Sequence, residues 1–142
     1  MTGTTNGCEC LMATVNLSSA DILTLASVPI TIVLAPGAGK IIILNSFTFC
    51  FKAGTTPYLN GQNSELTYNG TYTGFIGGGL IPASVICSAT DVVFNVISYP
   101  AKDITYGIDK AIEFTSKMAG IIEFDTGNGT AKIFIFYHII TL

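Results

Sequence analysis

The sequence predicts an all-β protein, an antiparallel β-sandwich or jelly-roll-like domain with one or two short helical turns. Short runs of β-branched and aromatic residues recur along its 142 residues, and clusters of Gly, Pro and Asn separate them. In the clearest run, residues 47–51 alternate phenylalanine with threonine and cysteine, the period of two that a sheet with two unlike faces requires. We therefore expect about six to nine strands without an internal repeat.

A flexible arm is expected at residues 1–12, ahead of a single β-sandwich domain at residues 13–142. The first segment consists mostly of small and polar residues and shows no apolar period. A chain of this length can bury a substantial core within one domain. No apolar stretch near Met1 has the character of a signal peptide, so a secretion signal is not expected.

The turn signals divide the chain into individual strands. Strands are expected at residues 29–34, 40–52, 65–68, 72–76, 92–98, 111–116, 121–124 and 130–142. One helical turn is expected at residues 18–25. Ser18 or Ser19 caps this turn, and Asp21 suits the positive end of the helix dipole. A second helical turn is expected at residues 82–88, with a proline in its first turn.

The last expected strand, residues 130–142, is apolar on both faces. Phe134 and Phe136 alternate with Ile133 and Ile135, so neither side of the strand is polar. A strand of this kind is typical of the centre of a sheet that is covered on both sides. The sequence therefore predicts a central position and cover on both faces.

The charge composition argues against binding to nucleic acids or to the surface of a membrane. Six lysines and no arginine stand against nine acidic residues, which gives a net charge of −3. Such a chain cannot neutralise a run of phosphates or bind guanine with a bidentate contact. A membrane span is also not expected, because residues 36–40 interrupt the most apolar window, residues 28–51, before it reaches about 20 residues.

Charged residues are too few for the surface of an ordinary monomer. They make up 11% of the chain, whereas typical domains carry about 25%. Hydrophobic residues make up 49%, and the mean hydropathy is +0.59. Because obligate oligomers bury faces that resemble half of a core, we expect a homo-oligomer.

Two short motifs resemble a catalytic signature and a phosphate-binding signature, but both are interpreted as turns. Residues 124–127 contain the D-T-G of aspartic proteases, whose chemistry needs two aspartates that share one proton. Asp, Gly and Asn within residues 125–129 favour a hairpin turn instead. Residues 36–40 end in Gly-Lys, but Leu34 and Ile41 stand where a phosphate loop has Gly and Ser or Thr. A turn between two strands is expected there.

No catalytic, cofactor-binding or metal-binding residue is assigned, and the protein is expected not to be an enzyme. His138, the single histidine, lies within the last expected strand, which favours a packed histidine over a general base. Residues 8–10, Cys-Glu-Cys, supply half of a metal site without a second half. Glu123 and Asp125 lie at a strand end and are expected to be solvated.

Several segments together resemble small structural proteins encoded by tailed bacteriophages. The first are residues 15–23 (VNLSSADIL), 28–33 (VPITIV) and 35–40 (APGAGK). A loop at residues 53–58 (AGTTPY) and a closing strand with a tyrosine at residues 132–138 (KIFIFYH) follow the same pattern. The likeness extends over most of the chain after the expected arm, although each motif is short.

This resemblance implies a non-enzymatic component of the phage particle, such as a head decoration protein, a head-fibre subunit or a tail-associated protein. It implies assembly as a homo-oligomer, with a trimer favoured, and contact with other virion proteins such as the major capsid protein. It also implies a location on the particle surface after synthesis in the bacterial cytoplasm. An alternative is a receptor- or carbohydrate-binding module of a phage fibre, in which the tyrosines of residues 58–72 stack on sugars.

Overall fold

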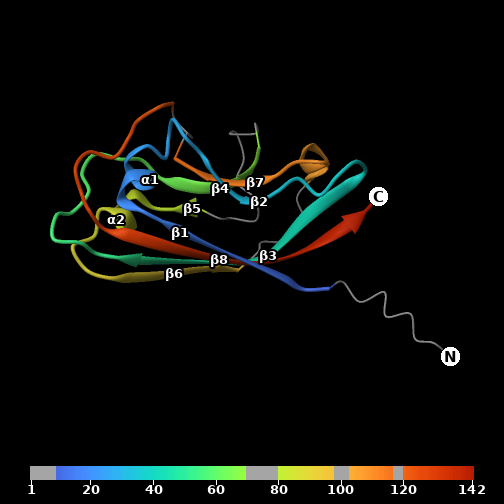
Figure 1. The fold of residues 1–142 in the computed structure, drawn as a ribbon, viewed down its shortest axis with the longest axis horizontal. Helices are drawn as coiled ribbons and strands as arrows, with labels where there is room; N and C mark the ends of the chain where they lie inside the picture. Colours follow the sequence, from blue (N-terminus) through green and yellow to red (C-terminus); the bar gives the residue numbers. More distant parts are fainter. Residues whose placement is uncertain (1–8, 70–79, 98–102, 117–119) are drawn as a thin grey trace.

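Two antiparallel sheets face each other in the computed structural model, which describes residues 9–69, 80–97, 103–116 and 120–142 (Figure 1). Sheet A has the order β1 (Leu11–Leu17), β8 (Thr130–Thr141), β3 (Lys40–Lys52) and β6 (Val92–Ile97). Sheet B has the order β2 (Ile30–Val33), β7 (Ile112–Thr115), β4 (Ser64–Tyr68) and β5 (Leu80–Ile81). These two layers confirm the predicted all-β sandwich.

Strand pairing follows one long antiparallel ribbon that is folded back on itself. β1 pairs with β8, β2 with β7, β3 with β6, and β4 with β5. β3 also pairs with β8, and β4 with β7, so that the ribbon rolls into two sheets. This order agrees with the predicted jelly-roll-like domain. As a consequence, the first and last described strands lie side by side in sheet A.

Short helical segments connect some of the strands. They are α1 (Ser19–Leu23), α2 (Ala83–Ile86) and the 3-10 turn η2 (Thr105–Gly107). At the start of α1, the Asp21 amide donates to Ser18 Oγ at 3.2 Å, and Asp21 Oδ2 accepts from the Ser18 amide at 2.8 Å. This capping box confirms the first predicted helical turn and identifies Ser18, not Ser19, as its cap. α2 follows Pro82, as predicted, whereas the sequence did not indicate η2.

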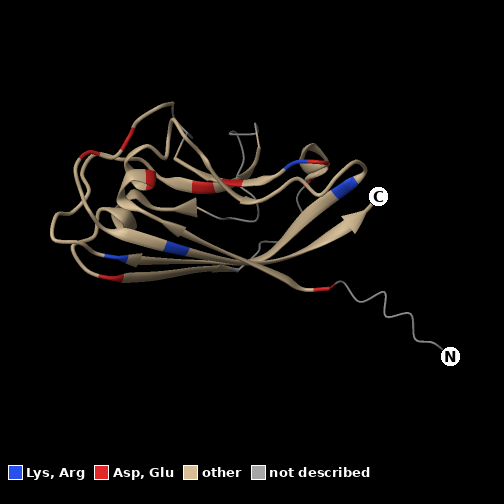
Figure 2. Ribbon diagram, viewed as in Figure 1, with Lys and Arg blue, Asp and Glu red and all other residues tan. Residues whose placement is uncertain are grey.

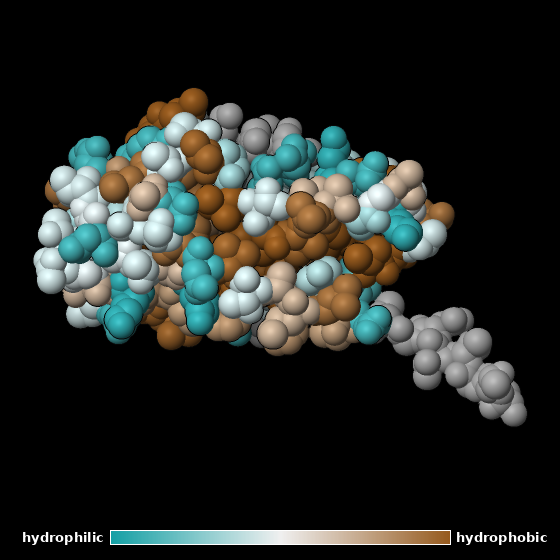
Figure 3. Space-filling view, viewed as in Figure 1, coloured by the Kyte–Doolittle hydropathy of each residue, from teal (hydrophilic) through white to brown (hydrophobic). Residues whose placement is uncertain are grey.

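The core lies between the sheets and contains many aromatic side chains. Phe47, Phe49 and Phe51 of β3 point inward, as their alternation predicted, and are at most 3% exposed. The centroid of the Phe49 ring lies 5.5 Å from that of Phe114 in β7, so aromatic contacts join the two layers. Burial of each such ring stabilises the fold by about 1.5–3 kcal/mol. In Figure 3, apolar surface forms a band along the middle of the molecule, between the layers.

The first strand begins two residues before the boundary expected between arm and domain. β1 begins at Leu11, and no strand was expected in residues 11–17. It pairs with β8 along its whole length, from Leu11 opposite Tyr137 to Leu17 opposite Ala131. The segment was missed because Met, Ala and Asn favour strands weakly, and its alternation is visible mainly beside a partner. Residues 1–8 of the expected arm lie outside the described part of the chain.

One expected strand is wrong. Residues 121–124 form no strand, and just after them Asp125 forms an isolated bridge with Leu59. Ile121 and Ile122 are exposed, and only Phe124 points into the core. A run of apolar residues alone therefore gave a false signal. The strand expected at residues 72–76 lies outside the described residues.

The last strand is central, as predicted, but the described residues cover only one of its faces. β8 lies between β1 and β3 in sheet A. Ile133 and Ile135 on its inner face are fully buried. On the other face, Phe134 is half-buried and Phe136 is 41% exposed. The expectation of cover on both faces is thus not met within the chain, because the sandwich has only two layers.

Candidate interaction surface

The D-T-G motif forms a turn, but not the expected hairpin. Thr126 and Gly127 both have positive φ angles, 48° and 93°, which the residues of a tight turn commonly adopt. The Asp125 carboxylate accepts a 2.6 Å hydrogen bond from the Asn60 side-chain amide. β7 and β8, the strands before and after this turn, belong to different sheets. The turn therefore lies in a crossover between the layers, and its aspartate holds a neighbouring loop.

The Gly-Lys motif forms the predicted turn between β2 and β3. The Lys40 amide donates a 3.2 Å hydrogen bond to the carbonyl of Gly37, and Gly37 and Gly39 both have positive φ angles. β3 begins at Lys40, so a strand follows the glycines. A phosphate loop needs the N-terminus of a helix at this position.

Glu123 is a structural anchor, contrary to the expectation that it is solvated. Its Oε2 accepts a 2.9 Å hydrogen bond from the Ala26 amide, and its Oε1 accepts a 2.7 Å bond from the Ser27 amide. The acceptor and its first donor are 97 residues apart in sequence. No local pattern indicates such a contact, and sequence reasoning therefore missed it. Asp125, two residues further on, is exposed and bonds Asn60 instead.

The single histidine lies against an amide side chain. His138 is half-buried in β8, and its Nδ1 lies 2.9 Å from Asn45 Oδ1. Asn45 occupies the register shift of β3 between Leu44 and Ser46. Glu9 and Cys10 are exposed, whereas Cys8 lies outside the described part. Within that part, no three His, Cys, Asp or Glu side chains are grouped so as to hold a metal ion.

The described tyrosines of the segment considered for sugar binding lie in the core. Tyr58 is fully buried, its hydroxyl donates to the Gly129 carbonyl at 2.7 Å, and burial raises the pKa of Tyr58 to about 12. Tyr68 is also fully buried and donates to the Ile42 carbonyl, and burial raises the pKa of Tyr68 as well. Neither ring offers a face to a ligand. Tyr72 lies outside the described residues.

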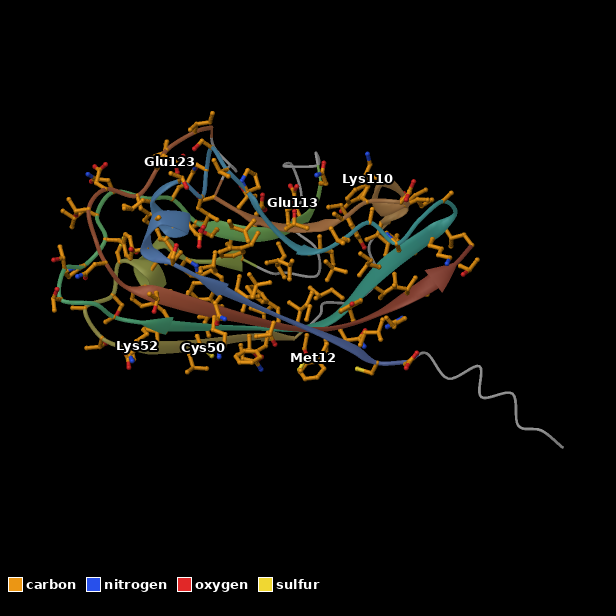
Figure 4. All side chains as sticks on the ribbon, in the orientation of Figure 1. Met12, Cys50, Lys52, Lys110, Glu113 and Glu123 are labelled. Carbon is orange, nitrogen blue, oxygen red and sulfur yellow. The ribbon has the colours of Figure 1, made fainter. Side chains whose placement is uncertain are left out.

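The uncovered side of sheet A carries exposed apolar side chains from several of its strands. Since Phe47, Phe49 and Phe51 point inward, the residues between them point outward, and antiparallel partners share a face. The outer face of sheet A consists of Met12, Thr14, Asn16, Thr130, Lys132, Phe134, Phe136, Ser46, Thr48, Cys50, Lys52, Val93 and Asn95. In Figure 4, Met12 and Cys50 lie on the side of sheet A away from sheet B.

This outer face carries two charged side chains, Lys132 in β8 and Lys52 at the end of β3. Lys132 Nζ lies 5.6 Å from the centroid of the Phe134 ring, a cation–π contact that covers part of the ring. Thr48 Oγ1 donates a 2.7 Å hydrogen bond to Asn95 Oδ1, so these two polar groups satisfy each other. Lys40, at the start of β3, is the remaining Lys, Arg, Asp or Glu in the strands of sheet A, whereas those in the strands of sheet B are Glu65 and Glu113 (Figure 2).

A shallow groove of about 770 Å³ lies at one end of the outer face, beside the ends of β1, β8, β3 and β6. Two lysines, Lys52 and Lys132, and two aspartates, Asp21 and Asp91, line it. Asp91 accepts a 2.9 Å hydrogen bond from the Ala53 amide, and Asp21 belongs to the cap of α1. Equal numbers of both signs make the groove neutral overall.

None of the helices in the described ranges is long and apolar enough to span a membrane. No protein-family model and no curated protein sequence matches the chain. Its fold is similar to that of a chain in the capsid asymmetric unit of the cyanophage Pam1, with a TM-score of 0.54 and 15% sequence identity. The similarity covers 92% of this chain and 84% of the cyanophage chain. At this identity, the likeness concerns the fold.

Proposed function

We propose that this protein is a non-enzymatic structural component of a bacteriophage virion. The similarity to a chain of a cyanophage capsid asymmetric unit supports the proposal most directly, because it extends over nearly the whole of both chains. A shared fold alone does not imply a shared function, so the argument also needs the surface of this chain. The phage-like sequence segments described above point in the same direction.

The chemistry of the described residues supports a binding role. Asp125, Glu123 and His138, the side chains with the most catalytic potential in the sequence, each bond a neighbouring loop or side chain. The outer face of sheet A combines exposed apolar groups with uncharged polar ones and two lysines near one end. Depletion of charge together with Met and Phe is typical of protein–protein interfaces.

The finer form of the proposal is a capsid decoration or head-fibre subunit at the particle surface. Its partners are copies of itself, with a trimer favoured, and other virion proteins such as the major capsid protein. The low charge of the chain supports protein contacts over contacts with nucleic acid. No observation on the described residues favours the carbohydrate-binding alternative, because Tyr58 and Tyr68 are buried.

The test is to examine particles from a culture that expresses this gene. Particles purified by density gradient are analysed by mass spectrometry and labelled with antibodies raised against the protein. The proposal predicts a stoichiometric amount of the chain in full particles and label on intact heads. Absence of the chain from purified particles would contradict the virion role, and label confined to tails would contradict the capsid position.

A further inference from the structure

We propose that a second copy of this chain covers the outer face of sheet A. The inference specifies a surface for the self-association in the proposed function, on which it rests in this respect, and a face that covers its own copy gives a twofold pair in place of the trimer favoured there. It depends on the exposure of that face and on the charges at its rim, and not on the phage particle. The two proposals therefore fail independently.

The composition of the face is that of a contact surface. Met12 is 59% exposed, Val93 is 71% exposed and Phe136 is 41% exposed. They come from β1, β6 and β8, so exposed apolar groups extend from one edge of sheet A to the other. The intervening positions are mostly Thr, Ser and Asn, which are uncharged. An exposed apolar surface spread over one face marks an interaction site.

The charges beside this face favour a copy of the same chain over a highly charged partner. The groove at its end holds Lys52 and Lys132 beside Asp21 and Asp91. A partner with one dominant sign of charge would meet like charge at one of these pairs. A symmetric contact brings the same patch of both copies together, so the lysines of one copy can face the aspartates of the other. In such a pair of copies, both the positive and the negative side chains of the groove find partners of opposite charge without a further protein.

The edge strands of sheet A also favour contact with a second copy of the chain. β1 and β6 are seven and six residues long and contain neither a charged residue nor proline. Edge strands of proteins that remain monomeric are commonly short or carry charges. In sheet B, the edge strands β2 and β5 are only four and two residues long. Sheet A is thus the less protected of the two sheets, both on its face and along its edges.

The size of the face sets the expected strength of association. Four strands about 4.8 Å apart and about seven residues long, at about 3.4 Å per residue, give a face of about 450 Å². If both faces are treated as flat, the contact covers about 900 Å² in total, and the side chains that project from the sheets add to this area. This total is near the lower limit for a specific interface. We therefore expect association that is reversible and depends on concentration in the micromolar range.

Substitutions at the exposed ends of the face test the proposal. Val93→Lys adds a third positive charge beside Lys52 and Lys132, and Met12→Lys places a charge toward the other end of the face, opposite Phe136. Both positions are exposed enough to leave the core intact. Ile121→Lys is the matched control, because Ile121 is 62% exposed and lies outside the face. Masses are measured by light scattering after size-exclusion chromatography, from about 1 to about 100 µM protein. Circular dichroism verifies that each variant is folded.

The wild type and the Ile121→Lys variant are expected to reach at least twice the monomer mass of 14.9 kDa as the concentration rises. In the variants with a substitution in the face, the concentration at the midpoint of association is expected to rise at least tenfold. A wild type that remains monomeric throughout, or face variants that associate like the wild type, would overturn the proposal.

Thiol labelling of the wild type gives a second measurement that needs no variant. Cys50 lies on the outer face of sheet A and is half-buried, whereas Cys87, at the end of α2, does not belong to the face. Labelling of Cys50 by a maleimide, followed by mass spectrometry, is expected to slow severalfold at high protein concentration. Labelling of Cys87 is expected to stay constant. Equal behaviour of both thiols would contradict the assigned face.

The particle experiment separates the two proposals. If the chain is found in particles but is a monomer with an accessible Cys50, the virion role stands and the self-association surface is wrong. If the chain associates through sheet A but is absent from particles, the surface stands and the virion role is wrong.

Discussion

The hydroxyl of Tyr58 donates a 2.7 Å hydrogen bond to the carbonyl of Gly129 across 71 residues of sequence. Both residues are buried, and Tyr58 also packs edge-on against Phe51 and Phe124, with ring centroids 6.2 and 6.0 Å away. The contact fastens the loop after β3 to the residue that precedes β8. It thereby joins the crossover between the sheets to the end of sheet A.

Removal of this hydroxyl is expected to destabilise the protein without unfolding it. Tyr58→Phe keeps the ring in the core but leaves the Gly129 carbonyl without its partner, at a cost of about 1 kcal/mol. Urea unfolding measures the loss as a lower midpoint at constant slope. Tyr106→Phe is the control, because Tyr106 is 37% exposed and water can replace its hydroxyl contacts. Equal losses of stability in both variants would show that the buried hydrogen bond contributes no more to the free energy of unfolding than an exposed hydroxyl does.

Alkaline pH is expected to destabilise the fold through the buried tyrosines. Burial raises the pKa of Tyr58 from 10.0 to about 12. Between these values the unfolded chain loses the phenolic proton while the folded chain retains it, so stability is complete below pH 10 and falls as the pH approaches 12. Urea unfolding at several pH values from about 9 to about 11.5 measures the decline.

The decline with pH should be smaller in Tyr58→Phe, since one shifted group is removed. It should not vanish, because burial also raises the pKa of Tyr68. Tyrosinate absorbance of the folded protein provides the control and is expected to lack the signal of these two residues until the chain unfolds. Titration of all tyrosines near pH 10 in the folded state would contradict their burial.

Replacement of Glu123 is expected to loosen the segment that follows α1. Glu123→Ala removes the acceptor of the Ala26 and Ser27 amides, at a cost of about 2 kcal/mol for the loss of charge-assisted bonds. Glu123→Gln keeps one acceptor oxygen, and about half of that loss is expected. Thermal unfolding and hydrogen exchange of the Ala26 amide measure the effect.

The neighbouring acid supplies the control for this prediction. Asp125→Ala removes an exposed bond to Asn60, and the expected loss is below about 1 kcal/mol. Faster exchange of the Ala26 amide is expected in the Glu123 variants alone. If both alanine variants behave alike, Glu123 does not anchor the segment.

The turn at the D-T-G motif is expected to require Gly127 for two reasons that can be tested separately, its positive φ angle and its close contact with the Tyr58 ring. Gly127 has a φ of 93°, and an added Cβ would meet the Tyr58 ring at 2.4 Å. Gly37 has a similar φ of 103°, with no atom within 4 Å of an added Cβ. Gly37→Ala therefore isolates the backbone cost of about 1–2 kcal/mol, and Gly127→Ala should lose about 3 kcal/mol or more. Denaturant unfolding of both variants measures the difference, and similar losses would contradict the close contact with Tyr58.

Features that depend on a few neighbouring residues were predicted from the sequence. The alternation of residues 47–51 placed three phenylalanines on the core side of β3, and the structure confirms it. The turn at residues 36–40 and a cap at Ser18 or Ser19 were also predicted, because glycine dihedrals and helix caps act within one turn of chain. The D-T-G segment was correctly predicted as a turn, although its place between the two sheets was not.

Features that depend on distant segments were decided only by the tertiary structure. Tyr58 and Tyr68 were considered as tyrosines that stack on sugars, whereas long-range hydrogen bonds hold both in the core. Glu123 finds its donors 97 residues away, so no motif near it gives a signal. β1 became recognisable as a strand beside β8, its partner at the other end of the chain.

The same distinction explains the candidate surface. The sequence alone determined that β8 is apolar on both faces, because alternation depends only on the pleat of the strand. Whether a face is covered depends on which elements pack there, and the roll of the ribbon supplies a second layer on one side of sheet A only. The exposure of Phe136, Met12 and Val93 is therefore decided by the tertiary structure, since burial arises from packing between segments that are remote in sequence.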